Sequence, residues 1–322
     1  MKRILIAGCG QHMRGTLSLY LKVIQGITIV GLVDVDSKAT AALAKHFPDA
    51  GWYEEIKQVN IPYDFAILAL PPAASFMALK FLANKAVQIF VEKPPAYTTK
   101  QITVLADLYR ENPLRLQIGF NFRFTKAFNY LKGESLAQEV SKICSMEFLS
   151  KHPKFGQWGI QQNLELWLRC NGIHALDLAY WLNGEYKIND VEVVEGRNGA
   201  FLLTVVCQHK DKSISVLNLG NSVTGFKINC KLNFSNGNSL ILNDLHNVEK
   251  AVADDRFMAY QHFTQKNLES GWEATGFGLE LDAFFLEKDF PGIPRLGDAL
   301  RASKICDQIM RKIWKSYPSS AL

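Results

Sequence analysis

The chain has 322 residues, of which 48% are hydrophobic, and a formal net charge of +5. This length is sufficient for two domains, each with its own core. Basic and acidic residues are interleaved without runs of like charge, so we expect no nucleic-acid partner. No apolar run approaches the roughly 18 residues that a membrane-spanning helix needs, so we expect no membrane partner.

Cysteine and histidine spacing gives further expectations. The six cysteines are scattered without a C-x-x-C pair, and the chain opens without a signal-peptide core. Both features indicate a reducing, cytoplasmic location. The seven histidines form neither an H-x-x-x-H nor an H-E-x-x-H motif. The sequence therefore predicts no metal site.

The first predicted strand, residues 4–7, continues directly into a glycine turn. Gly8 and Gly10 stand in that turn, and apolar residues at helical spacing follow it. Strand, glycine turn and helix together are typical of a site for a dinucleotide pyrophosphate, although a plain turn is the alternative. Met13 stands where the dinucleotide fingerprint has a third glycine or an alanine. The turn residues predicted to contact the cofactor are Gly8, Gly10, Gln11 and His12.

A second predicted strand, residues 27–33, ends at Asp34. An acidic residue at this distance from a glycine turn accepts hydrogen bonds from the ribose hydroxyls and repels a 2′-phosphate. The pattern favours NAD over NADP. Asp36 is predicted to cap the helix that follows.

Strands and helices continue to alternate as far as Gly119. The predicted elements are a strand at 65–70, a helix at 73–84, a strand at 88–92, a helix at 102–109 and a strand at 116–119. Successive βα units of this kind form a doubly wound parallel sheet. We expect residues 1–120 to be a dinucleotide-binding domain.

Lys93 follows the strand at 88–92 directly. Ligands of open α/β sheets bind beyond the carboxyl ends of the strands, where this lysine lies. Pro94 restricts Lys93 to extended backbone geometry and so holds the amine in place. A solvated surface lysine is the alternative. Leu70, Pro71, Glu92, Lys93 and Pro94, all at strand ends, complete the predicted cofactor contacts.

After residue 120 the pattern changes to consecutive strands with short turns, which predicts an antiparallel sheet. The predicted strands are 139–149, 188–195, 201–208, 213–219, 226–234 and 239–243. A helical stretch at 164–182 interrupts them, and helices at 279–286 and 297–314 close the chain. We expect residues 121–322 to be a substrate-binding and oligomerisation domain of α+β type, whose last helix packs back on the first domain.

A second polar cluster lies in the helical stretch. His174 and Asp177 fall on one helix face. A histidine among Leu and Trp is often a satisfied core residue, and a catalytic histidine is the other interpretation.

These motifs together resemble the glucose-fructose oxidoreductase / inositol dehydrogenase (Gfo/Idh/MocA) family. They are Gly8-x-Gly10, Asp34, Glu92-Lys93-Pro94, the run from Gly119 to Phe124 and the Gly-Ile-His-x-x-Asp stretch from 172 to 177. Their order and spacing match the family along nearly the whole chain. The resemblance implies an α/β protein with an N-terminal Rossmann parallel sheet and a C-terminal α+β domain with a mostly antiparallel open sheet.

The resemblance also implies an activity. Members transfer a hydride to or from a hydroxyl or keto carbon of a sugar, cyclitol or nucleotide-sugar, with NAD or NADP. Lys93 and His174 match the catalytic positions, and the residues do not decide which of them transfers the proton. The implied substrate contacts are Asn121, Arg123, Cys170, Asn171 and His174. A homodimer or homotetramer through the C-terminal sheet is implied as well.

One position departs from the family pattern. Members usually carry an aspartate four residues before the histidine, and this chain has Cys170 there. The missing carboxylate removes a candidate base, so reduction of a ketone or imine tolerates the change better than oxidation of an alcohol. A non-catalytic, NAD-gated sugar-binding or regulatory protein on the same scaffold is the runner-up. The third interpretation is an enzyme that uses NAD as a recycled hydride store during elimination or hydrolysis.

Overall fold

The computed structural model describes residues 1–138, 140–151, 164–223, 225–245, 247–253, 258–262, 275–286, 290 and 292–316. The chain divides into two compact units. Unit 1 contains Met1–Phe120 and Phe277–Arg301. Unit 2 contains Asn121–Gly276 and Ala302–Leu322.

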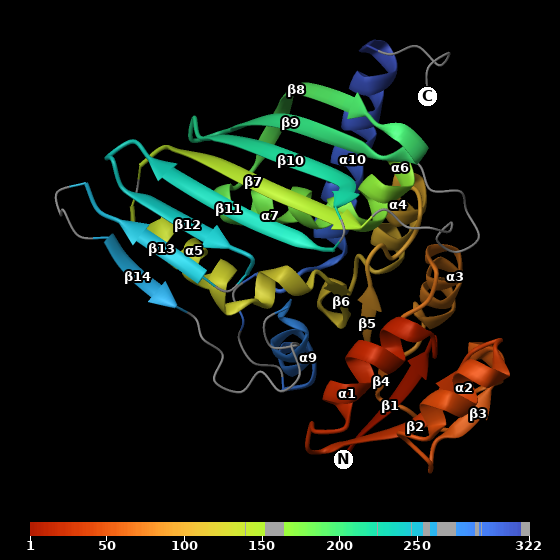
Figure 1. The fold of residues 1–322 in the computed structure, drawn as a ribbon. Helices are drawn as coiled ribbons and strands as arrows, with labels where there is room; N and C mark the ends of the chain where they lie inside the picture. The colour runs from red at the N-terminus through yellow and green to blue at the C-terminus, as the bar shows by residue number, and fades with distance from the viewer. Residues whose placement is uncertain are drawn as a thin grey trace. The chain divides into compact units, whose positions relative to one another are not determined.

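Unit 1 is built on a parallel sheet, as the alternating pattern predicts (Figure 1). Within residues 1–120, all of which are described, the strand order is β3-β2-β1-β4-β5-β6. Consecutive strands run outward from β1 in both directions, so the topological switch point lies between β1 and β4. The strands are β1 (Lys2–Ala7), β2 (Ile27–Val33), β3 (Gly51–Tyr53), β4 (Phe65–Leu68), β5 (Gln88–Glu92) and β6 (Leu116–Gly119).

Helices connect these strands. Met13–Leu17 is a π-helical turn that continues into α1 (Ser18–Leu21), and the longer helices are α2 (Ser37–Ala44), α3 (Pro72–Leu82) and α4 (Thr99–Leu108). Asp36 caps α2, because its side chain accepts a 2.9 Å hydrogen bond from the backbone N–H of Lys38. Every residue of β4 and β6 is buried, as expected for strands covered on both faces. The prediction of a doubly wound sheet is confirmed.

A helix from far along the chain completes the core of unit 1. Helix α9 (Phe277–Leu286) places Leu281, Phe284 and Phe285 in the same apolar cluster as β1 and β4. Gln117 Nε2 on β6 donates a 3.0 Å hydrogen bond to the backbone oxygen of Glu280. Helix α10 (Leu296–Ser316) begins in unit 1 and continues into unit 2.

Unit 2 is built on a second sheet, whose described strands have the order β14-β13-β12-β11-β7-β10-β9-β8. Its strands are β7 (Lys142–Lys151), β8 (Tyr186–Glu195), β9 (Phe201–His209), β10 (Ile214–Val223), β11 (Lys227–Phe234), β12 (Ser239–Asn243), β13 (Asn247–Ala251) and β14 (Met258–His262). Its helices are α5 (Lys126–Ala137), α6 (Leu164–Trp167), a π-helical turn at Leu168–Gly172 and α7 (Ile173–Asn183).

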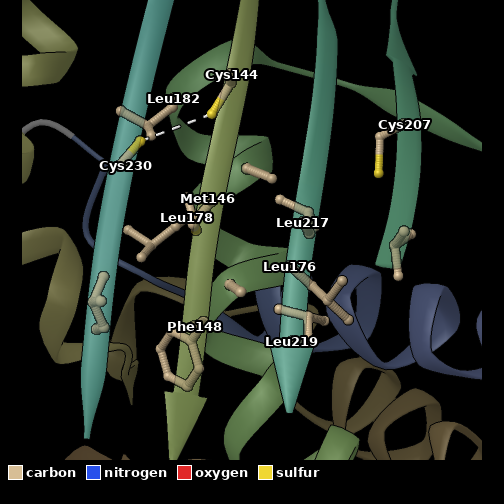
Figure 2. Packing of buried hydrophobic residues seen from close by; sticks show 14 of the residues in the cluster. Cys144, Met146, Phe148, Leu176, Leu178, Leu182, Cys207, Leu217, Leu219 and Cys230 are labelled. Atoms are coloured by element: carbon tan, nitrogen blue, oxygen red, sulfur yellow. Dashed lines mark hydrogen bonds between the residues drawn. The ribbon is translucent and has the colours of Figure 1, made fainter. Parts of the chain in front are cut away.

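Helix α7 packs against one face of this sheet. Figure 2 shows Leu176, Leu178 and Leu182 of α7 against side chains from neighbouring strands. Within this core the Sγ atoms of Cys144 and Cys230 lie 3.9 Å apart, and all six cysteines are buried free thiols. The opposite face is mixed, with polar residues such as Ser145 and Glu147 beside apolar ones such as Ile143 and Leu202.

The prediction of a mostly antiparallel second sheet is confirmed, with one exception. Strand β10 pairs β7 in parallel, because α6, α7, β8 and β9 intervene between them in the chain. Strands β3, β13 and β14 were not predicted from the sequence. The predicted start of β7 at Glu139 lies outside the described residues. None of the described helices is long and apolar enough to cross a membrane.

Candidate functional site

The turn after β1 depends on glycine at one position and leaves room at another. Gly8 has a φ of +93°, and a Cβ there would lie 2.3 Å from the backbone oxygen of Ala69. A Cβ at Gly10 would meet nothing within 4 Å. Gly8 is therefore required by the close approach of the turn to the end of β4. Gly10 leaves the open space that a ligand needs to reach the backbone.

Asp34 is tied to the same turn. Its Oδ2 accepts a 2.6 Å hydrogen bond from the backbone N–H of Cys9, and its Oδ1 accepts one of 2.9 Å from Asp36. The side chain is half-buried. These two bonds fix the carboxylate at the end of β2 while each oxygen keeps a lone pair for a further donor. Burial and the charge of Asp34 raise the pKa of the Cys9 thiol to about 12, so this cysteine is a neutral packing residue.

A cavity of about 700 Å³ opens beside the switch point. Gly8, Gly10, Asp34, Leu70 and Pro71, all predicted cofactor contacts, contribute to its lining. The remaining lining comes mainly from small and apolar side chains, among them Ala74, Met77 and Phe81 of α3. Asp36, Glu54, Glu55 and Lys57 also line the cavity. It thus combines an apolar wall with the fixed carboxylate of Asp34, which suits a base and ribose.

Two other predicted contacts of the turn, Gln11 and His12, do not line this cavity, and neither does Met13. Gln11 is exposed. His12 Nε2 and Glu92 Oε1 form a 2.9 Å hydrogen bond. Met13 is fully buried in the core of unit 1. The absence of a third glycine therefore reflects a large side chain that packs inward rather than toward the cavity.

The end of β5 carries the Glu-Lys-Pro motif. Glu92 is 8% exposed, and Lys93 is half-buried. The Lys93–Pro94 peptide bond is cis. On β6 the paired residue is Gly119, where a Cβ would lie 3.0 Å from Glu92 Oε2. Glycine at 119 thus makes room for the Glu92 carboxylate.

In unit 2, His174 lies in the first turn of α7 and is 6% exposed. Its ring centroid lies 4.8 Å from that of Phe122 and 5.9 Å from that of Phe148. Cys170, in the preceding π-helical turn, is 1% exposed, and Asn171 is half-buried. The surroundings of this histidine are thus largely aromatic.

Arg123 and Asn121 make contacts within unit 2. Arg123 Nε donates a 2.7 Å hydrogen bond to Asp177 Oδ2, and its Nη2 donates to Asp177 Oδ1. Both side chains are at most 3% exposed. Asn121 Nδ2 donates to the backbone oxygen of Thr275 at 2.7 Å. These bonds attach the segment after β6 to α7 and to the chain just before α9.

Sequence reasoning missed Glu280, which is fully buried in α9. The available signal was a lone carboxylate between Phe277 and Phe284 on an otherwise apolar helix face. Asp177 was recognised as a neighbour of His174, but its pairing with Arg123 was not foreseen.

The parallel sheet, its switch-point cavity and the glycine turn define unit 1 as a nucleotide-binding α/β unit of Rossmann type. Residues 2–120 match the model of the oxidoreductase family with an NAD-binding Rossmann fold, GFO_IDH_MocA. Over these residues the resemblance recognised from the motifs is confirmed.

Similarity to individual proteins is more distant. Glucose-6-phosphate 3-dehydrogenase of Bacillus subtilis (strain 168) is 24% identical over 191 residues, which are 56% of this chain and 54% of that protein. The match therefore spans about half the length of this curated relative.

Solved structures show the same fold along nearly the whole chain. A dehydrogenase from Chromobacterium violaceum has a TM-score of 0.86 at 22% identity, over 96% of this chain and 94% of that one. Myo-inositol dehydrogenase from Lactobacillus casei, in complex with NAD(H) and myo-inositol, has a TM-score of 0.76 at 16% identity, over 97% and 94%. At these identities the likeness establishes the two-unit fold.

Proposed function

We propose that this protein is an NAD(H)-dependent oxidoreductase that transfers a hydride to or from a hydroxyl or keto carbon of a sugar, cyclitol or nucleotide-sugar. The observation that carries the proposal is the cavity at the switch point, where Gly8, Gly10 and Asp34 meet. Residues 1–120 bind the cofactor in this proposal, and residues 121–322 bind the substrate.

The described residues of the cavity fit a dinucleotide. The backbone at Gly8 and Gly10 would approach the pyrophosphate, and the open space beside Gly10 supports this. Asp34 would accept hydrogen bonds from the adenosine ribose hydroxyls and repel a 2′-phosphate, so NAD is the preferred cofactor. Leu70 and Pro71 would cover the nucleotide from the end of β4.

Lys93 and His174 are the residues proposed to handle the proton. Bound NAD supplies the hydride acceptor or donor. Loss or gain of hydride at a carbon is accompanied by loss or gain of a proton on its oxygen. An amine or an imidazole can take that proton in oxidation and return it in reduction. Glu92, bonded to His12, supports the peptide that carries Lys93.

The second unit is proposed to present His174 and Asn171 to the substrate. Cys170 is buried and supplies no carboxylate, so we propose that Lys93 or His174 transfers the proton. Asn121 donates a hydrogen bond to Thr275, and Arg123 donates one to Asp177. We propose that these bonds hold in place the segment before α5 and the helix that carries His174.

Named activities of similar proteins support the substrate class. The Bacillus subtilis relative is a glucose-6-phosphate 3-dehydrogenase, and the Lactobacillus casei protein binds myo-inositol together with NAD(H). Both act on or bind compounds whose ring carbons carry hydroxyl groups. We extend this class, rather than either compound, to the present protein.

Self-association through the second sheet is part of the proposal. Ile143, Val194 and Leu202 are large apolar residues that are 50%, 67% and 48% exposed. Ile143 precedes the inward-facing Cys144 on β7, so it points to the face opposite α7. A second copy of the chain on this face would bury such residues, and light scattering that gives a monomer mass would contradict it.

The deciding experiment is titration of the purified protein with NADH and NADPH. Keto-sugars are then added to the NADH complex, and sugars, cyclitols and nucleotide-sugars are added to the protein with NAD+. We expect tighter binding of NADH than of NADPH, and a change in nicotinamide absorbance with one class of compound. Tight NADH binding without any redox change across the panel would contradict catalysis. It would support the NAD-gated binding protein instead.

A further inference from the structure

Glu280 is an unusual residue for the interior of unit 1. It is 0% exposed, and among the described residues neither of its carboxyl oxygens has a hydrogen-bond partner. Buried polar groups are almost always hydrogen-bonded, so an unsatisfied carboxyl calls for a physical explanation. An isolated carboxylate is far more costly to bury than a neutral carboxylic acid.

Two aromatic contacts show which residues the Glu280 face of α9 packs against. Phe277, Glu280 and Phe284 lie along one stripe of the helix, since residues three and four apart are neighbours. At one end of the stripe the ring centroid of Phe277 lies 5.4 Å from that of His12. At the other end the ring centroid of Phe284 lies 5.8 Å from that of Phe90 on β5.

These contacts direct Glu280 to the carboxyl end of β5. Phe90 and Glu92 lie on the same face of the strand, because side chains alternate along it. His12 is bonded to Glu92 at 2.9 Å. Phe284 of α9 therefore lies beside Phe90 of β5, and Phe277 lies beside His12, which is bonded to Glu92. Glu280 lies between Phe277 and Phe284 on the same face of α9. The charges of Glu92 and Lys93 both act on its carboxyl group.

Burial raises the pKa of Glu280 well above its usual range, and the negative charge of Glu92 raises it further. The ammonium of Lys93 acts in the opposite direction. Other titratable residues around α9 are Tyr20, whose ring lies against Gly278, and Lys2, whose Nζ donates to the backbone oxygen of Phe285 at the far end of the helix.

We propose that Glu280 is held as a neutral carboxylic acid beside Glu92 and Lys93, and that it is a positioning residue for Lys93. A neutral Glu280 adds no negative charge to that of Glu92 beside Lys93. A second carboxylate would favour the ammonium form of Lys93 and so remove the base that oxidation of a hydroxyl requires. This functional consequence rests on the proposed function, whereas the protonation of Glu280 does not.

Infrared spectroscopy of the intact protein in D2O tests the protonation directly. Wild-type protein at pH 7 should show the carbonyl stretch of a neutral carboxylic acid, and Glu280→Gln should lose that band. Asp282→Asn, on the same helix but half-exposed, should keep it. If Glu280→Gln and wild type give identical spectra in this region, Glu280 is ionised and the proposal is overturned.

The pH at which the band disappears tests the two neighbours. Lys93→Met removes the opposing positive charge, so the midpoint should rise by about one pH unit or more. Glu92→Gln removes a negative charge, so the midpoint should fall by about the same amount. A band that does not respond to either change would show that Glu280 is merely buried. Neither NAD nor a substrate is needed, so a protein inactive on every sugar would still give a clear answer.

Discussion

The guanidinium of Arg123 is bound by the carboxylate of Asp177, on the helix that also carries His174. Both partners are almost fully buried, so removal of one charge leaves the other without compensation. Asp177→Asn should lower the free energy of unfolding by about 3–5 kcal/mol. Chemical denaturation measures this, with Asp107→Asn as the control.

The control removes one partner of a surface ion pair. The side chains of Asp107 and Arg110 are 60% and 70% exposed, respectively. Surface pairs contribute about 0–1 kcal/mol, so this variant should unfold close to wild type. Equal and small losses in both variants would show that the Arg123 pair does not stabilise the unit.

Lys93→Ala should lower turnover far more than it weakens NADH binding. The amine is proposed to exchange a proton with the substrate oxygen, and general acid–base groups contribute about 10²–10⁴-fold in rate. Stopped-flow or steady-state rates with the active compound, together with the Kd for NADH, separate the two effects. His174→Asn provides the comparison, since the larger loss and the altered pH profile identify the proton-transfer residue. Unchanged turnover in Lys93→Ala would remove Lys93 from the mechanism.

Much of unit 1 was predictable because its signals are local. The glycine turn, Asp34 and the apolar run before Lys93 each lie within a few residues of a strand end, and the parallel order follows from alternation. The contribution of α9 was not predictable in this way. Its residues are more than 150 positions from β6 in the chain, and no local pattern places Gln117 against Glu280. The pairing of Arg123 with Asp177 was also not predictable, because the two residues are far apart in the chain and a buried charge pair leaves no periodic pattern.

Asp34→Ala should weaken NAD binding and relax the discrimination against NADP. Its oxygens accept hydrogen bonds from Cys9 and Asp36, and its charge is the feature that would repel a 2′-phosphate. Loss of a charge-assisted hydrogen bond to the ribose corresponds to about 1.5–3 kcal/mol, or roughly 10- to 150-fold in Kd. Calorimetric titration with both cofactors measures the ratio. Asp49→Ala, at an exposed position that does not line the cavity, is the control, and an unaltered preference in Asp34→Ala would exclude Asp34 from the cofactor site.

Gly8→Ala and Gly10→Ala should separate folding from cofactor binding. At Gly8 a Cβ would lie 2.3 Å from a backbone oxygen, and the φ of +93° adds strain of about 1–2 kcal/mol. At Gly10 a Cβ meets nothing within 4 Å. Gly8→Ala should therefore lower both the Tm and NADH affinity, whereas Gly10→Ala should keep the Tm and lose affinity. A Gly10→Ala variant that binds NADH like wild type would show that the pyrophosphate does not approach this residue.

The stability of Glu280→Gln relative to wild type should increase as the pH rises. In the unfolded chain the carboxyl of Glu280 loses its proton near the ordinary pKa of about 4.3, whereas in the folded protein the raised pKa keeps it bound. Between these two values the unfolded state binds fewer protons, so wild-type stability falls as the pH rises. The slope from this one group is at most about 1.4 kcal/mol per pH unit, and glutamine, which does not titrate, removes it. Denaturant unfolding of wild type and Glu280→Gln at several values between about pH 5 and 8 measures the difference. A constant difference between Glu280→Gln and wild type across this range would mean that Glu280 already titrates at its usual pKa.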